Sequence, residues 1–515
     1  MSNSSMRLVF RRKFVGQASL RLPQTWQRVY RGLVAAVLTS SSLINPYLGS
    51  QPALAQTKAY CQLSADAIAQ KESLRVSAVK GNSDSQGRYR TLLKKHAESL
   101  QQCRQQTWPR VQAIWLRLYP CDIRPGALDE LMDRLVNRGY NQVYVEVFSD
   151  GQVLLPKAEN STPWPSVIRT PGAEKVDLLA QAINKGRERG MQVYAWMFAM
   201  NFGYSYSQRP DRQQALARDG MGKTSLSVTE DGSQAFIDPY NAQAKRDYYQ
   251  LVQEVVRRRP DGVLFDYIRY PRQSGSASVV TKVQDLWIYG DGSRQALYDR
   301  ALNNKGRELI ERYITKGFIS AGDVAGVDKL YPDEGSPLWQ GRNPAADEMK
   351  ATASQRQARL QWELWQLSVA HAAQGVVDFV ALASLPAQRQ RIRTGAVFFP
   401  EGNQTVGQGG YDSRVQPWDR FPSYMEWHPM SYATCGNTSC IVPQVERVLS
   451  LAPPGTQVSP VLAGAWGKSF NSRPSLEQQM QAIRAGAPQV NSISHFAFSW
   501  QEPEVDRDRK FCGAN

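Results

Sequence analysis

The stretch Pro260–Pro271 reads P-D-G-V-L-F-D-Y-I-R-Y-P and contains a short apolar run, Gly262–Phe265. An apolar run without polar alternation is typical of a strand that is buried on both faces of a parallel sheet. The run ends at Asp266, which is followed by aromatic residues and Arg269. In a (β/α)₈ barrel, catalytic groups lie at the C-terminal ends of the strands. The stretch therefore predicts a barrel strand that ends in a candidate catalytic carboxylate; the alternative is a structural aspartate that caps the next loop.

Apolar runs alternate with helical stretches from residue 108 onward, as in parallel βα units. Two of the helical stretches end at a glycine, Gly139 and Gly190, which is a common way for a helix to end. The expected strands are residues 113–116, 142–148, 192–197, 263–265, 395–399, 424–428, 458–462 and 494–498. Eight strands in this order predict a (β/α)₈ TIM barrel over residues 108–515.

Two segments do not fit the barrel pattern. Residues 56–107 hold two stretches of helical periodicity around a polar break, and predict a helical N-terminal segment that packs on the barrel or acts as a spacer. Residues 272–352 are polar and irregular and follow the fourth strand. They predict an insertion on the active-site face, either as a substrate-binding lid or as a loop without a role.

The N-terminus predicts a signal peptide over residues 1–55. A basic region precedes the apolar run 32–39, and Ala53-Leu54-Ala55 supplies an A-x-A cleavage site. The run is short for a membrane span, and no later segment is expected to cross a membrane. We therefore expect export to the periplasm or the extracellular space. The alternative is an uncleaved membrane anchor, which would be the one membrane contact.

Six cysteines agree with an oxidising compartment, and six allow fifteen pairings. Cys435 and Cys440 bracket a turn-like loop and form the best local pair. A second possible pair closes the expected helical hairpin, and the two remaining cysteines would tie the chain end to the barrel start. The second and third pairs are Cys61 with Cys103 and Cys121 with Cys512.

Charge and motifs exclude several classes of protein. The formal net charge is +16, of which seven basic residues in residues 1–55 account for seven, and the basic remainder favours acidic polymers. We find no nucleic-acid-binding module. The chain lacks a C-x-x-C pair and its four histidines are scattered, so we expect no metal and no cofactor. The G-x-S-x-G, H-E-x-x-H and dinucleotide-binding patterns are also missing.

Carboxylates at strand ends remain as candidate catalytic groups. Glycoside hydrolysis needs two carboxyl groups that flank one bond, one of which donates a proton to the leaving oxygen. Glu426 lies between Tyr424 and Trp427, and apolar neighbours would help it to keep its proton, so we assign it as the acid. Asp266 lies near Arg269 and would stay ionised as the nucleophile or stabilising carboxylate.

The chain resembles a known family in several of these motifs. Asp238-Pro239-Tyr240, a helix and then the D-G-V-L-F-D-Y-I-R-Y-P run of residues 261–271 are similar to the glycosyl-hydrolase-like family 10 of bacterial envelope proteins. Residues 113–116, 145–156 and 193–196 also match the pattern, so the resemblance covers roughly residues 110–272. It implies hydrolysis of glycosidic bonds in an envelope polysaccharide, such as peptidoglycan glycan strands.

The chain departs from the family pattern in two ways. The family often has two adjacent aspartates at strand four, but here Tyr267 takes the second position. The insertion 272–352 is also atypical, which affects the expected size of the substrate. A polysaccharide-binding or envelope-scaffold protein without catalysis is therefore the alternative function.

The sequence thus predicts an exported, monomeric glycosidase that contacts a polysaccharide and no nucleic acid. Its predicted catalytic residues are Asp266 and Glu426. Acids, aromatic residues and other polar side chains near the strand ends are expected to bind the sugar: Glu146, Asp150, Trp196, Arg269, Tyr270, His428, Tyr432, Trp466 and Trp500.

Overall fold

The structure is a computed structural model that describes residues 60–229 and 232–512. The chain divides into two compact units, residues 1–51 and 52–515, and all described residues belong to the second unit. The predicted signal peptide, residues 1–55, lies outside the described residues.

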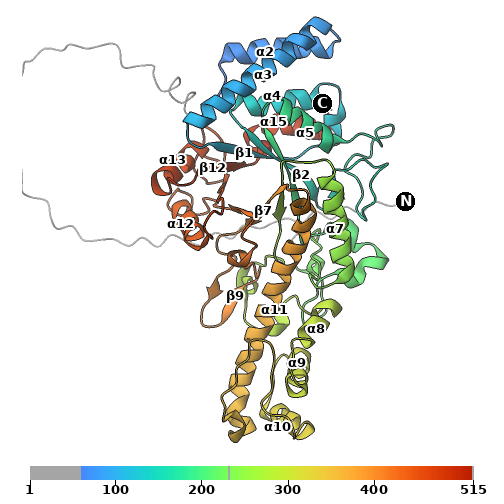
Figure 1. Ribbon diagram of the computed structural model, residues 1–515, viewed down its shortest axis with the longest axis vertical. Coiled ribbons are helices and arrows are strands. Elements are labelled where there is room, and N and C mark those ends of the chain that lie inside the picture. Colours follow the sequence, from blue (N-terminus) through green and yellow to red (C-terminus); the bar gives the residue numbers. More distant parts are fainter. Residues whose placement is uncertain (1–59, 230–231, 513–515) are drawn as a thin grey trace, which may run out of the picture. The chain divides into compact units, whose positions relative to one another are not determined.

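The predicted (β/α)₈ barrel is confirmed. Within the described residues, the parallel strands are adjacent in the order β10-β7-β5-β4-β2-β1-β12-β11 (Figure 1). Parallel bridges join Trp427 to Val458 and Met430 to Val461, which leaves the barrel nearly closed. The strands are β1 (Val111–Leu116), β2 (Gln142–Ser149), β4 (Gln192–Phe198), β5 (Gly262–Asp266), β7 (Arg393–Phe398), β10 (Glu426–Pro429), β11 (Val461–Ala463) and β12 (Ser492–Phe496).

Burial explains why the strand sequences are mostly apolar. Every residue of β2 and β5 is buried, because helices cover the outside of the barrel and side chains fill its inside. Trp115, Tyr144 and Trp196 pack inside the barrel, and the Trp115 ring meets each of the other two edge to face at a centroid distance of 4.8 Å. The interior is therefore a packed core.

Helices connect most of the strands. The connecting helices are α4 (Ala127–Asn137), α5 (Leu178–Glu188), α7 (Ala242–Val256), α11 (Ala353–Arg389), α12 (Ile441–Leu451) and α13 (Leu476–Gly486). Gly139 and Gly190 follow α4 and α5 with φ of 79° and 71°, as expected for glycines that end helices. Between β7 and β10 the chain forms a hairpin, β8 (Thr405–Val406) and β9 (Gly410–Asp412). The short helices α14 (Phe498–Gln501) and α15 (Pro503–Phe511) follow β12.

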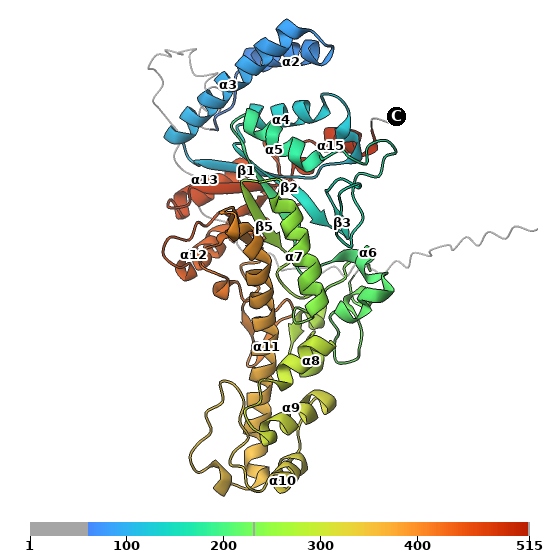
Figure 2. The ribbon, with the colours of Figure 1, turned by 45° about the vertical axis from the view of Figure 1, so that its right-hand side comes forward.

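The N-terminal helical segment packs on the barrel helices. It consists of α2 (Ala65–Val79) and α3 (Ser83–Gln106), which lie beside α4 and α5 (Figures 1 and 2). A buried charge network fixes it: Arg189 donates to Asp133 at 2.8 Å and to the Tyr89 hydroxyl at 2.7 Å. The Lys71 ammonium lies 3.6 Å from Asp133. The segment is therefore part of the folded body and does not act as a spacer.

The insertion after β5 contains more helix than its polar sequence suggested. It holds α8 (Asp291–Tyr298), α9 (Asn304–Lys316) and α10 (Ala321–Leu330), which lie along the N-terminal half of α11 (Figure 2). A two-residue strand, β6 (Val279–Val280), pairs with β9. The insertion and the β8–β9 hairpin thus form one structure that starts from the C-terminal ends of β5 and β7.

Helix α11 is long and apolar enough to cross a membrane, which corrects the expectation that no segment beyond the N-terminus reaches that length. However, 67% of its most apolar stretch is buried inside the molecule, where α11 packs on α7. Thr352 caps its N-terminus and accepts from the Gln355 backbone N–H at 3.3 Å. We therefore describe α11 as a core helix of the barrel.

Three disulfides are present, and they join the cysteines in the predicted pairs. Cys61–Cys103 ties the start of the described chain to α3, and Cys121–Cys512 ties the end of α15 to the loop after β1. Cys435–Cys440 closes the short loop before α12.

Candidate active site

Asp266 is the last residue of β5 and lies at the C-terminal end of the barrel. Its carboxylate accepts from the Tyr267 backbone N–H at 2.7 Å and from the Trp196 indole N–H at 3.1 Å. Only 7% of the residue is exposed. Burial raises the pKa of Asp266 to about 6, although both hydrogen bonds and the Arg269 guanidinium oppose the shift. The group can therefore hold a proton in weakly acidic solution, although it is mostly ionised at neutral pH. Its assignment as the ionised carboxylate of the pair stays a prediction.

The residue after Asp266 has a strained backbone. Tyr267 has φ of 53°, in the left-handed region that bulky side chains rarely adopt. Its ring stacks on Phe198 at a centroid distance of 4.1 Å, and the Arg269 guanidinium lies 4.5 Å from its centre. The turn thus places a flat aromatic surface where the resembled family often has a second aspartate.

Aromatic rings extend from Asp266 across neighbouring strand ends. Phe496, at the end of β12, contacts the rings of Trp196, Tyr432 and Trp500 at centroid distances of 6.2, 6.2 and 5.6 Å. Burial raises the pKa of Tyr432, and the nearby charge of Asp266 adds to the rise. The predicted sugar-binding residues Trp196, Tyr432 and Trp500 therefore lie in one group with Asp266.

Glu146 is the second carboxylate near Asp266. It lies on β2, and its charge contributes to the raised pKa of Asp266. Arg117 donates to both of its oxygens at 2.7 Å, and the Ser149 hydroxyl donates to one of them. A cavity of about 330 Å³ opens beside Glu146. Its lining includes Arg117, Tyr119, Ser149, Asp150 and Lys510.

Sequence reasoning missed Arg117 and Phe496. Arg117 directly follows the first strand, and Phe496 ends the last one. A polar residue at a strand end was the signal that identified Asp266, and the same signal applied to Arg117. Phe496 gave no such signal, because an aromatic residue in an apolar run is most simply explained as core.

Glu426 does not lie with Asp266. It is the first residue of β10, and Arg393, the first residue of β7, lies 3.7 Å from its carboxylate. The Tyr194 hydroxyl donates to it at 3.1 Å, and His428 lies 3.4 Å away. These contacts place Glu426 and His428 inside the barrel toward its N-terminal end. The expectation that Glu426 pairs with Asp266 therefore finds no support in the geometry.

The pKa of Glu426 is also shifted in the direction opposite to the one expected for a group that keeps its proton. Burial alone would raise its pKa, but His428, Arg393 and the Tyr194 hydroxyl hold the pKa below its ordinary value. The apolar neighbours that suggested an acid do not decide the outcome, because polar groups reach the carboxylate from β4 and β7.

Two further predicted sugar-binding residues are structural. Tyr270 is fully buried, and burial raises the pKa of its hydroxyl. The Trp466 indole N–H donates to the Tyr140 hydroxyl at 3.1 Å, and its ring packs on Tyr60 and His495. Neither residue is placed to contact a substrate at Asp266.

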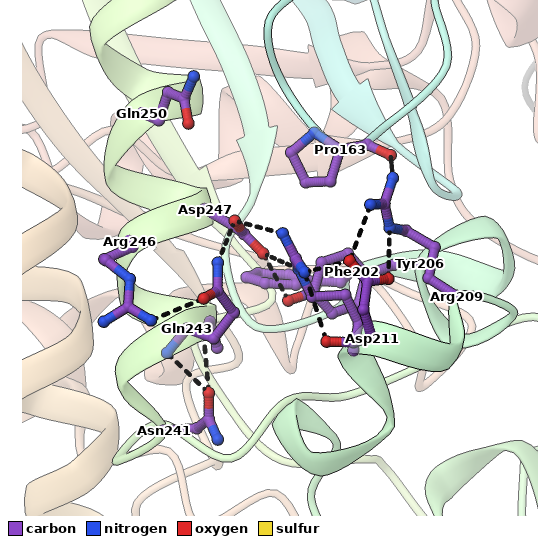
Figure 3. Close-up of polar contacts among 12 residues, drawn as sticks. Pro163, Phe202, Tyr206, Arg209, Asp211, Asn241, Gln243, Arg246, Asp247 and Gln250 are labelled. Atoms are coloured by element: carbon purple, nitrogen blue, oxygen red, sulfur yellow. Dashed lines mark hydrogen bonds and ion pairs between the residues drawn. The ribbon is translucent and has the colours of Figure 1, made fainter.

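The loop after β4 is fixed to both Asp266 and α7. The Ala199 backbone N–H donates to the carbonyl of Asp266 at 2.6 Å. Further along the loop, the Tyr206 hydroxyl donates to buried Asp247 of α7 at 2.8 Å (Figure 3). The Arg212 guanidinium donates to the same carboxylate at 2.6 Å. Asp247 therefore supports a loop whose first residue is bonded to the site.

Within the described residues, no group of three His, Cys, Asp or Glu side chains is placed to hold a metal ion. The arrangement at the barrel's C-terminal end consists of a protonatable carboxyl group, an arginine-bound carboxylate and an aromatic wall. These groups can donate a proton, oppose a positive charge and stack on an apolar ring face.

Comparison with solved structures finds matches at low sequence identity. The catalytic domain of β-amylase from Paenibacillus polymyxa has a TM-score of 0.41 and 11% identity, covering 76% of this chain and 92% of that one. A β-galactosidase from Marinomonas ef1 has a TM-score of 0.43 and 9% identity, covering 78% and 58%. A β-N-acetylhexosaminidase from Bacteroides fragilis has a TM-score of 0.38 and 9% identity, covering 79% and 64%.

Among curated proteins, none matches this chain. A family model does match: residues 110–310 fit the Glycosyl hydrolase-like 10 family, which confirms the resemblance seen in the sequence over that range.

Proposed function

We propose that the protein is an exported glycoside hydrolase that cleaves an envelope or extracellular polysaccharide, with peptidoglycan glycan strands as the first candidate. The observation that carries the proposal is Asp266. It is a buried carboxyl group at the C-terminal end of a barrel strand, with a pKa of about 6 and an aromatic wall beside it. A general acid in glycoside hydrolysis needs this combination of position and proton affinity. Three disulfides support the exported location.

In the proposed reaction, Asp266 gives its proton to the glycosidic oxygen. The electron pair of the bond between the anomeric carbon and that oxygen goes to the oxygen as the bond breaks. Glu146 opposes the positive charge that develops at the anomeric carbon, while Arg117 fixes the orientation of Glu146. Water then adds at the anomeric carbon and its proton returns to Asp266, which restores the acid.

The experiment measures reducing ends released from purified polysaccharides, including peptide-stripped peptidoglycan, by the full chain. Asp266→Asn and Glu146→Gln should each lower the rate by about a hundredfold or more, because each removes a group that acts in the transition state. Glu426→Gln is the matched control and should keep its activity, since Glu426 lies toward the other end of the barrel. Equal rates for the wild type and Asp266→Asn would refute the proposal.

Polysaccharide binding without hydrolysis is the second candidate function. The observation that favours it is the Tyr267 ring, which occupies the position of a second aspartate and stacks on Phe198. In the same experiment, this candidate predicts that the wild type sediments with the polysaccharide but releases no reducing ends.

A further inference from the structure

A second groove lies on the structure formed by the insertion and the β8–β9 hairpin. It has a volume of about 810 Å³ and runs between α11, the hairpin and the segment around Phe318. The insertion starts from the C-terminal end of β5 and the hairpin starts from that of β7, so both extend from the barrel end that carries Asp266. Figure 1 shows β9 beside α11, with α9 and α10 further along the same helix.

Trp362 on α11 is the main aromatic residue of this groove. It is 49% exposed, although most tryptophans in the chain are buried. The backbone of Gly409 lies against its six-membered ring, so closely that a Cβ at Gly409 would be 3.0 Å from a ring carbon. One turn further along α11, the buried Trp365 donates its indole N–H to the Gly409 carbonyl at 2.9 Å. The hairpin loop is therefore pinned to α11, and the Trp362 ring has a fixed support.

The rest of the lining combines apolar and amide groups. Phe318 and Val406 are exposed large apolar side chains that flank Trp362. The polar lining includes Gln284, Gln361, Gln408 and Lys282, and no carboxylate lines the groove. The side-chain amide oxygen of Gln361 accepts from the Ile319 backbone N–H at 3.1 Å, which holds the Gln361 side chain in place.

This lining fits a carbohydrate chain better than an apolar protein segment. A sugar ring has an apolar face that stacks on an aromatic ring, and hydroxyl groups that exchange hydrogen bonds with amides. A docked apolar helix would instead leave several buried amides without partners, at a cost in free energy. The lysine and the missing carboxylates also allow anionic groups on the glycan.

We propose that the groove around Trp362 is a second glycan-binding site that holds the polysaccharide at a distance from Asp266. The identity of the polymer rests on the proposed function. When a polymer binds at one site, its effective concentration at the other site rises. A groove with low affinity for glycan can therefore strengthen the binding of long substrates, but not of short ones.

The test compares the full chain with Trp362→Ala in two assays. Co-sedimentation with insoluble, cross-linked peptidoglycan should show about tenfold weaker binding by Trp362→Ala. Release of reducing ends from a trisaccharide fragment of the same glycan should be unchanged, because the fragment is too short to reach both sites. Trp362→Phe should bind nearly as well as the wild type, since it keeps an aromatic face. Tyr424→Ala is the matched control, because Tyr424 is 51% exposed and precedes the N-terminal end of β10.

These assays can refute the second glycan-binding site and the hydrolase activity independently of each other. Binding of Trp362→Ala at the wild-type level, or no binding by the wild type, would overturn the second site. A wild type that binds through Trp362 but cleaves neither the polymer nor the trisaccharide would support the second site and refute the hydrolase. If Trp362→Ala instead changes the oligomeric state with unchanged glycan binding, the groove is an interface between copies of the chain and the proposal is wrong.

Discussion

Asp266 and Glu426 are both buried carboxyl groups, but their partners differ. Asp266 has one charged neighbour that favours its ionised form, Arg269, and burial dominates, so its pKa rises to about 6. Glu426 has Arg393, His428 and the Tyr194 hydroxyl beside it, and its pKa falls below the ordinary value. Burial alone therefore does not identify an acid, because the direction of the shift depends on whether charged and hydrogen-bonding partners outweigh desolvation.

The stability of the protein should depend on pH through Asp266. Its pKa is about 6 in the folded state and 3.8 ordinarily, so the stability it contributes is present below about pH 4 and lost as pH rises through 6. Asp266→Asn does not titrate, so its free energy of unfolding relative to the wild type should rise by about 3 kcal/mol between pH 4 and pH 8. Urea denaturation of both proteins at several pH values measures this difference. Parallel curves for the two proteins would contradict the raised pKa.

Glu426→Gln should lower stability and leave hydrolysis intact. At pH 7 the variant loses the charge that faces Arg393 and His428, so we expect a loss of about 1 kcal/mol. Because the folded-state pKa of Glu426 is lowered, its contribution is present above the unfolded pKa and disappears as pH falls through the folded pKa. The difference in melting temperature should therefore shrink in acid. A folded Glu426→Gln variant without hydrolytic activity would contradict this expectation and show that the Glu426 carboxyl group is needed for hydrolysis.

At the scale of elements, the loop between β4 and α7 depends on one buried carboxylate. Asp247→Ala would remove the buried carboxylate that the Tyr206 hydroxyl and the Arg212 guanidinium donate to, and we expect a loss of about 2 to 4 kcal/mol. Activity should fall as well, because the loop is bonded to the backbone of Asp266. Thermal unfolding and the rate of reducing-end release measure the two effects.

Asp211→Ala is the matched control for this prediction. Asp211 lies on the same loop and also contacts Arg212, but its side chain is exposed. Surface ion pairs contribute little, so the variant should leave the stability nearly unchanged. Equal losses for the two variants would mean that burial of Asp247 is not what anchors the loop.

The sequence predicts well where the strands lie, but it predicts poorly how each strand pairs with its neighbours. Buried parallel strands appear as continuous apolar runs, which is why the run before Asp266 was assigned correctly. The sixth strand was expected from residue 424 but begins at Glu426, and this offset moves Glu426 to the N-terminal end. An apolar run does not fix its own register, because pairing with β7 sets the start of the strand.

Long-range contacts explain what else the sequence could not predict. The insertion forms a small sheet in which β6 pairs with β9, more than 100 residues away. Arg117 and Glu146 come together because two strands are adjacent, although they are 29 residues apart in sequence. Each of these contacts depends on the closed barrel and not on local propensity.

For the whole molecule, each disulfide should contribute to the free energy of unfolding according to the length of chain that it encloses. Cys121 and Cys512 are 391 residues apart, and Cys435 and Cys440 are 5 apart. In the chain-entropy model, removing the long link costs about 6 kcal/mol and removing the short one about 2 kcal/mol. Calorimetry on the two double-serine variants should therefore show the larger fall in melting temperature for Cys121→Ser with Cys512→Ser. An equal or reversed order would show that unfolded-chain entropy does not govern their effect.

The barrel, the N-terminal helices and the insertion have separate roles in the proposed function. The barrel carries Asp266 and Glu146, the disulfide-linked helices brace α4 and α5, and the insertion with its hairpin carries the Trp362 groove. In this proposal, the insertion makes binding depend on the length of the substrate, while the barrel cleaves the glycosidic bond.

The pH dependence of hydrolysis is the most direct test of Asp266 as the acid. The rate of reducing-end release by the full chain should be measured on one cleaved polysaccharide between pH 4 and pH 8. If protonated Asp266 is the acid, the rate falls about tenfold per pH unit above a midpoint near 6, because the acid loses its proton there. A rate that stays constant or rises from pH 5 to pH 7 would contradict this role of Asp266.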